Sequence, residues 1–385
     1  MKKGAKIALA LGGVALVGGA IFFANEANVF PRSSRPVRSF ERAEKIWSAG
    51  DYVCARVGGD ARGLRCATLG IGRDPVENAI SVPFLSDPSA MVEDPPNVCA
   101  LERGEIVCWN MATPILSGLG LVYSPEQQRA GTIDHGAIPE RLAFRLPMKG
   151  TVRSLVSVQS NFCALDDEGI SCFKRGSLTT RTPEKRWQEK ARTMFVAGEL
   201  VCTDDGDTVQ CFADPAQYTT SPVPNAPPFA LKVRATGATG ITAIAASYWS
   251  FCVLGAGGLS CAKRAKGGAP EVEELRLTKV EGVGAPTKIW GAGFDVMVLD
   301  GNRILKLDGR EGKGVQVWGT LGEGEEIYTY PRSSDWFIYR SGNMVRSPNY
   351  PWPIKYSVGG RPSQVVRLGL DTCVLVDGQT KCFGF

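Results

Sequence analysis

Twelve cysteines and one histidine are the residues of this 385-residue chain best suited to nucleophilic, redox or metal chemistry. Five cysteine pairs share one spacing, with a turn dipeptide near the middle, as in the unit from Cys373 to Cys382 around Asp377-Gly378. Asp-Gly between apolar runs favours a type I′ hairpin, because that turn needs φ > 0 at both central residues. In this hairpin the two cysteines face each other with Cα atoms about 4.5 Å apart, a separation that a disulfide can span.

The same hairpin geometry, with two cysteines facing each other on either side of a turn, predicts six disulfides that use all twelve cysteines. A zinc site would need Cys-x2-4-Cys knuckles, which the sequence lacks. Reduced, buried cysteines are the other alternative, and an even count in hairpin register argues against it. The expected pairs are Cys54–Cys66, Cys99–Cys108, Cys163–Cys172, Cys202–Cys211, Cys252–Cys261 and Cys373–Cys382. Two sulfur-free hairpins are also expected, with Val296 opposite Leu305 around Asp300-Gly301, and Phe337 opposite Arg346 around Ser341-Gly342.

Catalytic residue types are scarce. A nucleophilic triad needs a base, and the only histidine is His135, which we expect to be an ordinary loop residue. The run from Asp204 to Asp207 could ligate calcium, but a turn explains the same residues. No phosphate loop or dinucleotide fingerprint occurs. We therefore expect no cofactor, metal site or catalytic residue, although two carboxylates brought together for glycoside hydrolysis remain an alternative.

The elements that position these cysteines are repeated. Eight hairpins begin near residues 54, 99, 163, 202, 252, 296, 337 and 373, so the period is close to 40–45 residues. An apolar strand that often ends in a small residue precedes each hairpin, and a variable stretch follows it. This pattern predicts an all-β fold, a closed β-propeller of seven to eight four-stranded blades over residues 42–385, preceded by one N-terminal hydrophobic helix.

Several repeated motifs resemble one known family. They are Ala292-Gly293, Cys99-Ala100-Leu101, Cys163-Ala164-Leu165, Cys108-Trp109-Asn110 and Cys382-Phe383-Gly384. This pattern is similar to the repeat of the regulator of chromosome condensation family, above all to its bacterial, cysteine-paired version. The resemblance implies a propeller, typically of seven blades. The family's histidine after Ala-Gly is missing here, so no residue is carried over for nucleotide exchange and no small GTPase partner is expected.

Ring closure can be predicted from the chain ends. The last unit stops at Phe385, directly after its third strand, so its fourth strand must come from elsewhere. Residues 35–41 are the available donor, and we expect them to pair with the last blade.

The N-terminus predicts export. Lys2, Lys3 and Lys6 precede an apolar run over residues 7–24, so residues 1–24 are expected to be a signal anchor or transmembrane segment. A signal peptide that is cleaved to release a secreted protein is the alternative. Residues 25–41 would form a linker and the closing strand. Because disulfides require an oxidising compartment, the body is expected in the periplasm or the extracellular space.

Charge argues against nucleic acid as a partner. The chain has 44 Lys/Arg and 39 Asp/Glu, and residues 1–45 contain eight of the former and three of the latter. The remainder therefore has 36 of each, and the body has no net basic field to attract a polyanion.

Two stretches are candidate binding surfaces. One runs from residue 349 to 356 and places Tyr350, Trp352 and Tyr356 among prolines. The other is the insertion at 123–148, which contains His135. The expected function is that of a non-catalytic binding or scaffold module for an envelope protein or glycan. The alternative is a carboxylate-type enzyme acting on polysaccharide in the propeller channel.

Overall fold

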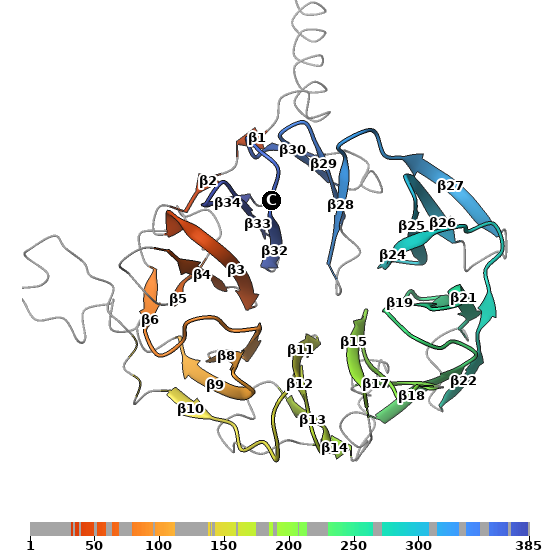
Figure 1. The fold of residues 1–385 in the computed structure, drawn as a ribbon, viewed down its shortest axis with the longest axis horizontal. Helices are drawn as coiled ribbons and strands as arrows, with labels where there is room; N and C mark the ends of the chain where they lie inside the picture. Colours follow the sequence, from red (N-terminus) through yellow and green to blue (C-terminus); the bar gives the residue numbers. More distant parts are fainter. Residues whose placement is uncertain are drawn as a thin grey trace, which may run out of the picture.

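The computed structural model shows a ring of eight β-sheets, the blades, around a central channel (Figure 1). In each blade the four strands counted outward from the channel pair antiparallel with their neighbours, and the innermost strand lies at the channel (Figure 1). The described residues are 32–33, 35–37, 40–49, 52–58, 64–68, 79–94, 97–111, 138, 140, 143–158, 161–174, 185–187, 191–206, 208–213, 230–264, 272–307, 314–330, 336–346, 354–368 and 371–383.

Blades 1 to 4 occupy the first half of the ring. Blade 1 contains β3 (Ala43–Ala49), β4 (Tyr52–Val57), β5 (Leu64–Thr68) and β6 (Ile80–Val82). Blade 2 contains β7 (Ala90–Asp94), β8 (Asn97–Glu102), β9 (Glu105–Asn110) and β10 (Ala143–Arg145). Blade 3 contains β11 (Ser154–Val158), β12 (Asn161–Asp166), β13 (Gly169–Lys174) and β14 (Lys185–Trp187). Blade 4 contains β15 (Thr193–Ala197), β16 (Leu200–Asp204), β17 (Thr208–Ala213), β18 (Ala230–Thr236) and a fifth strand, β22 (Glu273–Arg276).

Blades 5 to 8 complete it. Blade 5 contains β19 (Ala243–Ala246), β20 (Ser250–Gly255), β21 (Gly258–Lys263) and β23 (Thr278–Lys279). Blade 6 contains β24 (Pro286–Ala292), β25 (Asp295–Asp300), β26 (Arg303–Leu307) and β27 (Val315–Thr320). Blade 7 contains β28 (Glu326–Thr329), β29 (Trp336–Arg340), β30 (Asn343–Arg346), β31 (Lys355–Ser357) and a fifth strand, β1 (Arg32–Ser33). Blade 8 contains β32 (Gln364–Leu368), β33 (Asp371–Val376), β34 (Gln379–Phe383) and β2 (Arg35–Pro36).

The propeller prediction is confirmed, with eight blades as the number of hairpins indicates. The expectation of four strands in every blade is wrong for blades 4 and 7, where β22 and β1 each add a parallel fifth strand. The apolar run at 7–24 lies outside the described residues. Within the described part of the chain, no helix is long and apolar enough to cross a membrane.

The core is divided among the spaces between neighbouring blades. Side chains alternate between the two faces of each sheet, because successive residues of a strand point in opposite directions. In β4, Tyr52 and Cys54 pack against blade 2, whereas Val53 and Ala55 pack against blade 8. One buried apolar cluster of this kind fills each of the eight spaces. The ring is therefore held together by side chains on both faces of every blade.

The predicted ring closure is confirmed. Strand β2 pairs antiparallel with β34, with Arg35 opposite Cys382, and the backbone N–H of Val37 donates to the carbonyl oxygen of Thr380 at 2.7 Å. The side chains of Val37 and Phe40 are buried between blades 8 and 1. Strand β1 pairs with β31 of blade 7, so the segment before blade 1 binds two neighbouring blades.

All six predicted disulfides are present, and each joins the second and third strands of a blade at a Cα separation of 4.0–4.1 Å. In the last hairpin Asp377 and Gly378 have φ values of 50° and 73°, as a type I′ turn requires. Blades 6 and 7 have no cysteine. Of their two hairpins, the predicted register of Phe337 opposite Arg346 is confirmed.

The predicted register of the blade 6 hairpin is wrong. Val296 faces Leu307 rather than Leu305, and Gly301-Asn302 forms the two-residue turn. Asp300 therefore ends β25 instead of occupying the turn. Its buried carboxylate accepts hydrogen bonds from the N–H groups of Gly284 (3.1 Å) and Ala285 (2.5 Å) and pairs with Arg303. These hydrogen bonds hold Asp300 at the end of β25, which explains why the turn and the hairpin register differ from the prediction.

Asp300 predicts a loss of stability in acid. Burial opposes ionisation of this carboxyl, but the N–H donors of Ala285 and Gly284, together with Arg303, lower its pKa below the usual value. A lowered pKa in the folded state stabilises the protein above the unfolded-state value of about 4, and this stabilisation is lost as the pH falls. We expect Asp300→Ala to lower the free energy of unfolding at pH 7 by about 1–3 kcal/mol, because two backbone N–H donors and Arg303 lose their acceptor.

Urea unfolding of both proteins between pH 7 and pH 3 measures this effect. The difference between wild type and Asp300→Ala should shrink below about pH 4. A difference that stays constant across this range would contradict the role of the ionised carboxylate.

Candidate functional site

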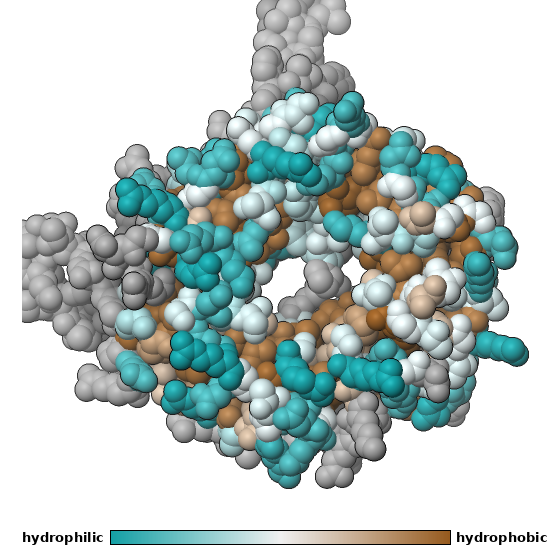
Figure 2. Space-filling view, viewed as in Figure 1, coloured by the Kyte–Doolittle hydropathy of each residue, from teal (hydrophilic) through white to brown (hydrophobic). Residues whose placement is uncertain are grey.

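A cavity of about 510 Å³ opens along the channel, next to the first strands of blades 3 to 7. It is lined by β11, β15, β19 and β24, together with Thr329 and Tyr330. Most of the lining is apolar, as in Val196, Ile244 and Ile289, and none of the described lining residues has a formal charge at neutral pH. Its size lies within the range of about 300–1,000 Å³ that is typical of ligand pockets. Figure 2 shows hydrophobic residues bordering the central opening.

An exposed aromatic cluster lies where the first strands of blades 5 and 6 end. Tyr248 contacts Trp249 and Phe294 edge to face, with ring centroids 4.6 Å and 5.9 Å apart. Tyr248 is 49% exposed and Phe294 is 63% exposed, whereas Trp249 is nearly buried. We call Tyr248, Trp249 and Phe294 the aromatic cluster. The residues beside it, Ala246 and Gly293, line the cavity.

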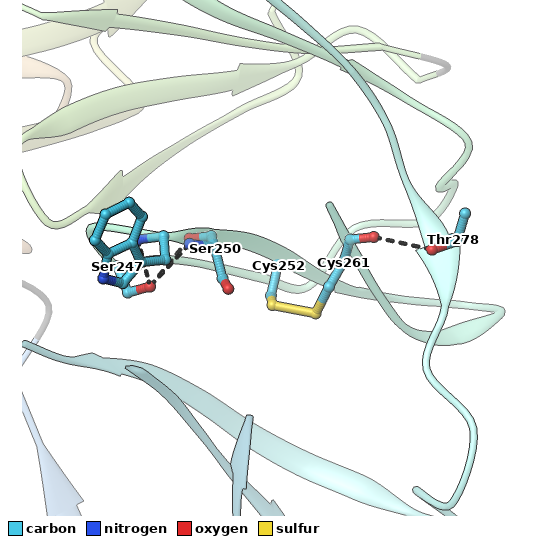
Figure 3. The surroundings of a disulfide bond; sticks show 6 residues. Ser247, Ser250, Cys252, Cys261 and Thr278 are labelled. Carbon is cyan, nitrogen blue, oxygen red and sulfur yellow. Dashed lines mark hydrogen bonds between the residues drawn. A yellow bond between two sulfur atoms is a disulfide. The ribbon is translucent and has the colours of Figure 1, made fainter. Parts of the chain in front are cut away.

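A hydrogen-bonded turn positions two of these rings. The Ser247 hydroxyl oxygen accepts a hydrogen bond from the backbone N–H of Ser250 at 3.0 Å (Figure 3). It also accepts one from the backbone N–H of Trp249 at 3.4 Å. The Ser247 carbonyl oxygen accepts a bond from Arg264, and Arg264 forms a largely buried ion pair with Glu273 at 3.3 Å. Because Glu273 begins the fifth strand of blade 4, this ion pair fixes the turn of blade 5 to its neighbour.

Close backbone packing brings the turns of blades 5 and 6 together. A Cβ atom at Gly291 would overlap the carbonyl oxygen of Ala246, so only glycine fits there. The N–H of Tyr248 donates to the carbonyl oxygen of Gly293 at 3.5 Å. Gly293 has a φ of 66°, which glycine adopts at little cost. The small residues at the ends of these first strands are therefore required where the blades meet.

The strand directions show which connections share this end of the propeller. In a blade of four antiparallel strands, the turn between strands one and two and the connection between strands three and four lie at the same end. We call the end that carries the aromatic cluster the aromatic face. Strands β9 and β10 flank the insertion that contains His135, and β30 and β31 flank the segment with Tyr350 and Trp352. Those three residues lie outside the described residues, but the strand ends that flank them lie at the aromatic face.

Tyr356 is a correction to the predicted surface. Its side chain is 1% exposed and stacks on Phe383 with ring centroids 4.2 Å apart. It belongs to β31, and in a strand alternate side chains point into the space between blades. Tyr356 therefore packs between blades 7 and 8 and is not exposed for binding.

Two described carboxylates at the start of blade 7 are held by arginines. Glu325 and Glu326 line a separate groove of about 390 Å³ between blades 6 and 7, where they pair with Arg340 and Arg361. The hydrogen bonds from these arginines lower the pKa of both carboxyls, while burial and then Glu326 raise the pKa of Tyr328. Neither glutamate is therefore set up as a proton donor.

The possible calcium ligands near residue 204 are used within a turn. Asp204 accepts from the N–H of Gly206 at 2.7 Å, and Asp205 accepts from the N–H of Thr208 at 2.9 Å. Among the residues that the structure describes, no group of three or more His, Cys, Asp or Glu side chains could hold a metal ion. The turn interpretation is confirmed for Asp204 and Asp205, whereas Asp207 lies outside the described residues.

No protein-family model and no curated protein matches the chain. Several solved structures are similar at low sequence identity. PorZ, an essential bacterial surface component of the type-IX secretion system of Porphyromonas gingivalis, is 12% identical with a TM-score of 0.41 over 89% of this chain, which spans 42% of PorZ. Human WBSCR16 is 12% identical with a TM-score of 0.42, covering 89% of this chain and 87% of its own. AztD from Citrobacter koseri is 10% identical with a TM-score of 0.42, covering 86% and 87%.

Proposed function

We propose that this protein is a non-catalytic binding module that holds a protein or glycan of the cell envelope at its aromatic face. The observation that carries the proposal is the exposed pair of Tyr248 and Phe294 beside a largely apolar cavity. Large aromatic side chains dominate binding energetics, because they bury much surface with little loss of side-chain entropy. Arg264 and Gly291 hold their turns rigidly, so few rotamers are lost on binding.

The proposed location outside the cytosol rests on the disulfides. All twelve cysteines are paired, and such bonds persist in oxidising compartments. Residues 7–24 would hold the body at a membrane, or their cleavage would release it. The family resemblance in the repeats remains a prediction. It contributes only the fold to this proposal.

A polysaccharide-cleaving enzyme would require carboxylates in the lining of the channel cavity. Glycosidases need two carboxylates about 5–10 Å apart on either side of the substrate bond. None of the described residues lining the channel cavity is Asp or Glu, and Glu325 and Glu326 are each held by an arginine. We therefore favour binding over hydrolysis.

Alanine replacement of the exposed rings tests the proposal. The double variant Tyr248→Ala/Phe294→Ala should weaken partner binding about 30-fold or more, since truncation of a binding hot spot costs about 2 kcal/mol or more. A photo-crosslinking residue at position 294, used in intact cells, identifies the partner as protein or glycan, and purified partner then gives the dissociation constants. The matched control is Val317→Ala, which truncates an exposed apolar side chain on the outer strand β27 of blade 6.

Two results would contradict this site. One is unchanged affinity of the folded double variant for the purified partner. The other is equal crosslinking of the same partner from positions 294 and 317. A separate Tyr350→Ala/Trp352→Ala variant tests whether the segment predicted from sequence contributes to the same binding.

A further inference from the structure

Charge is distributed radially in the propeller. We call the first and second strands of each blade, counted from the channel, the inner strands, and the remaining strands the outer strands. The inner strands contain five Lys/Arg and ten Asp/Glu, whereas the outer strands contain 17 Lys/Arg and three Asp/Glu. The three acidic residues of the outer strands are Glu105, Glu273 and Glu274. The described strands therefore form a ring that is acidic inside and basic at its rim.

The fold itself uses much of the acidic charge inside the ring. Asp166, Asp204 and Asp300 each end an inner strand and accept hydrogen bonds from backbone N–H groups of turns and connections. The basic rim includes side chains that are exposed to solvent, such as Lys263 and Lys279 of blade 5. An excess of positive charge along the rim is complementary to a negatively charged surface outside the chain.

The segment before blade 1 shows where on the rim the N-terminal residues join the body. Strands β1 and β2 are the outermost strands of blades 7 and 8, so the chain enters the propeller at its outer rim (Figure 1). Eight residue steps separate the end of the apolar run at Ala24 from Arg32. Because an extended chain covers at most about 3.6 Å per residue, this connection spans at most about 29 Å.

This short connection limits which blades can lie nearest to a membrane that holds residues 7–24. A compact body of about 350 residues is about 50 Å across. Blades 3 and 4 lie on the far side of the ring from β1 and β2 (Figure 1). Their rim cannot be the part closest to the membrane, because the connection is shorter than the ring. Blades 7 and 8 are the part of the rim that the chain holds at the membrane.

We infer that the propeller stands edge-on to an anionic lipid surface, with the outer strands of blades 7 and 8 facing the headgroups. The inference rests on the proposed membrane attachment through residues 7–24. These outer strands contain five Lys/Arg and no Asp/Glu. Anionic headgroups attract basic residues within about one Debye length, which is about 8–10 Å at physiological salt.

A flat orientation on the membrane fits the charges less well. It would bring the acidic inner strands as close to the negative lipid surface as the basic rim. The edge-on orientation keeps the inner strands of most blades farther than a Debye length from the headgroups. It also leaves the aromatic face perpendicular to the membrane, where a partner in the envelope can reach Tyr248 and Phe294.

Photo-crosslinking to lipid tests this orientation in the full chain, reconstituted into vesicles of phosphatidylglycerol and phosphatidylcholine. Ser357 on β31 of blade 7 and Arg276 on β22 of blade 4 are both exposed residues of outer strands. A benzophenone amino acid at position 357 should form lipid adducts about five times as often as one at position 276, or more. Position 294, on the aromatic face, should form as few adducts as position 276.

A charge reversal at the rim tests the role of the basic residues. Lys355→Glu, on the outer strand β31, should lower the ratio of adducts at 357 to those at 276 about threefold in the anionic vesicles. The matched control is Lys279→Glu, on the outermost strand β23 of blade 5, which should leave the ratio unchanged. Circular dichroism checks that both variants are folded.

Three results would overturn the inference, and they can be told apart. Protein that does not float with the vesicles would overturn the membrane attachment together with the orientation. Attached protein that forms equal lipid adducts at positions 357 and 276 would overturn the orientation alone, while partner binding at position 294 could still be measured. A ratio that Lys355→Glu does not change would overturn the contact between the basic rim and the lipid headgroups.

Discussion

A chain that begins at residue 38 is expected to lose about 3–6 kcal/mol of unfolding free energy compared with one that begins at Arg32. The deletion removes β1, β2 and the backbone bond from Val37 to Thr380. Burial of the Val37 side chain alone is worth about 1.5–3 kcal/mol, and each backbone hydrogen bond adds about 1 kcal/mol. The loss should be large because the closing strand belongs to the seam between blades 8 and 1.

Urea unfolding of the two truncated chains measures this loss. The full chain with Val37→Asp provides a second variant, because a buried carboxylate at the seam should destabilise it without shortening the chain. Identical unfolding midpoints for the chains beginning at 32 and 38 would contradict the closure that the structure shows.

Reduction of the disulfides is expected to lower the free energy of unfolding by an amount comparable to the total stability of a typical domain. In the chain-entropy model each short loop contributes up to about 2–3 kcal/mol, so six disulfides together contribute on the order of 10 kcal/mol. Natural domains have only about 5–15 kcal/mol of net stability. The reduced protein should therefore unfold far below the melting temperature of the oxidised one. Thermal melts with and without reductant measure the shift, and thiol titration of denatured protein should find no thiols before reduction and twelve after it.

Blades 6 and 7 provide an internal control for the effect of the disulfides, because they have none. In a hydrogen-exchange measurement on the oxidised protein, the hairpins of these two blades should exchange faster than the disulfide-bonded hairpins. Reduction should remove most of this difference. Uniform exchange across all blades in the oxidised state would contradict a local role for the disulfides.

The sequence predicts the architecture well because hairpin chemistry is local. The Asp377-Gly378 turn sets the register that brings Cys373 opposite Cys382, and the same spacing recurs along the chain. The error at Asp300 has a physical reason: its carboxylate binds the N–H groups of Gly284 and Ala285, which no turn rule includes. Local sequence rules also cannot predict the fifth strands β1 and β22, because these strands pair with segments that are distant in the sequence.

The candidate site is much less predictable. Tyr248 and Phe294 are 46 positions apart, and their turns are brought together by the packing of Gly291 against Ala246 and by the hydrogen bond from Tyr248 to Gly293. The sequence does contain a signal, since adjacent aromatic residues follow the alanine-rich strand that ends at Ala246. Tyr356 shows the opposite limit. The nearby prolines and aromatic residues predict an exposed position for Tyr356, but the alternation of side chains along β31 directs its ring into the core.

The position of β2 also determines when the ring can close during synthesis. Arg35 and Pro36 are synthesised long before their partner strand β34 (Gln379–Phe383). The eighth blade cannot be completed until all seven other blades and β34 have been translated. Until then β2 lacks its partner strand and the apolar face of blade 1 at the seam is uncovered, so both can associate wrongly with other chains. Cells that make this protein should therefore keep the nascent chain unfolded or shielded until β34 is available.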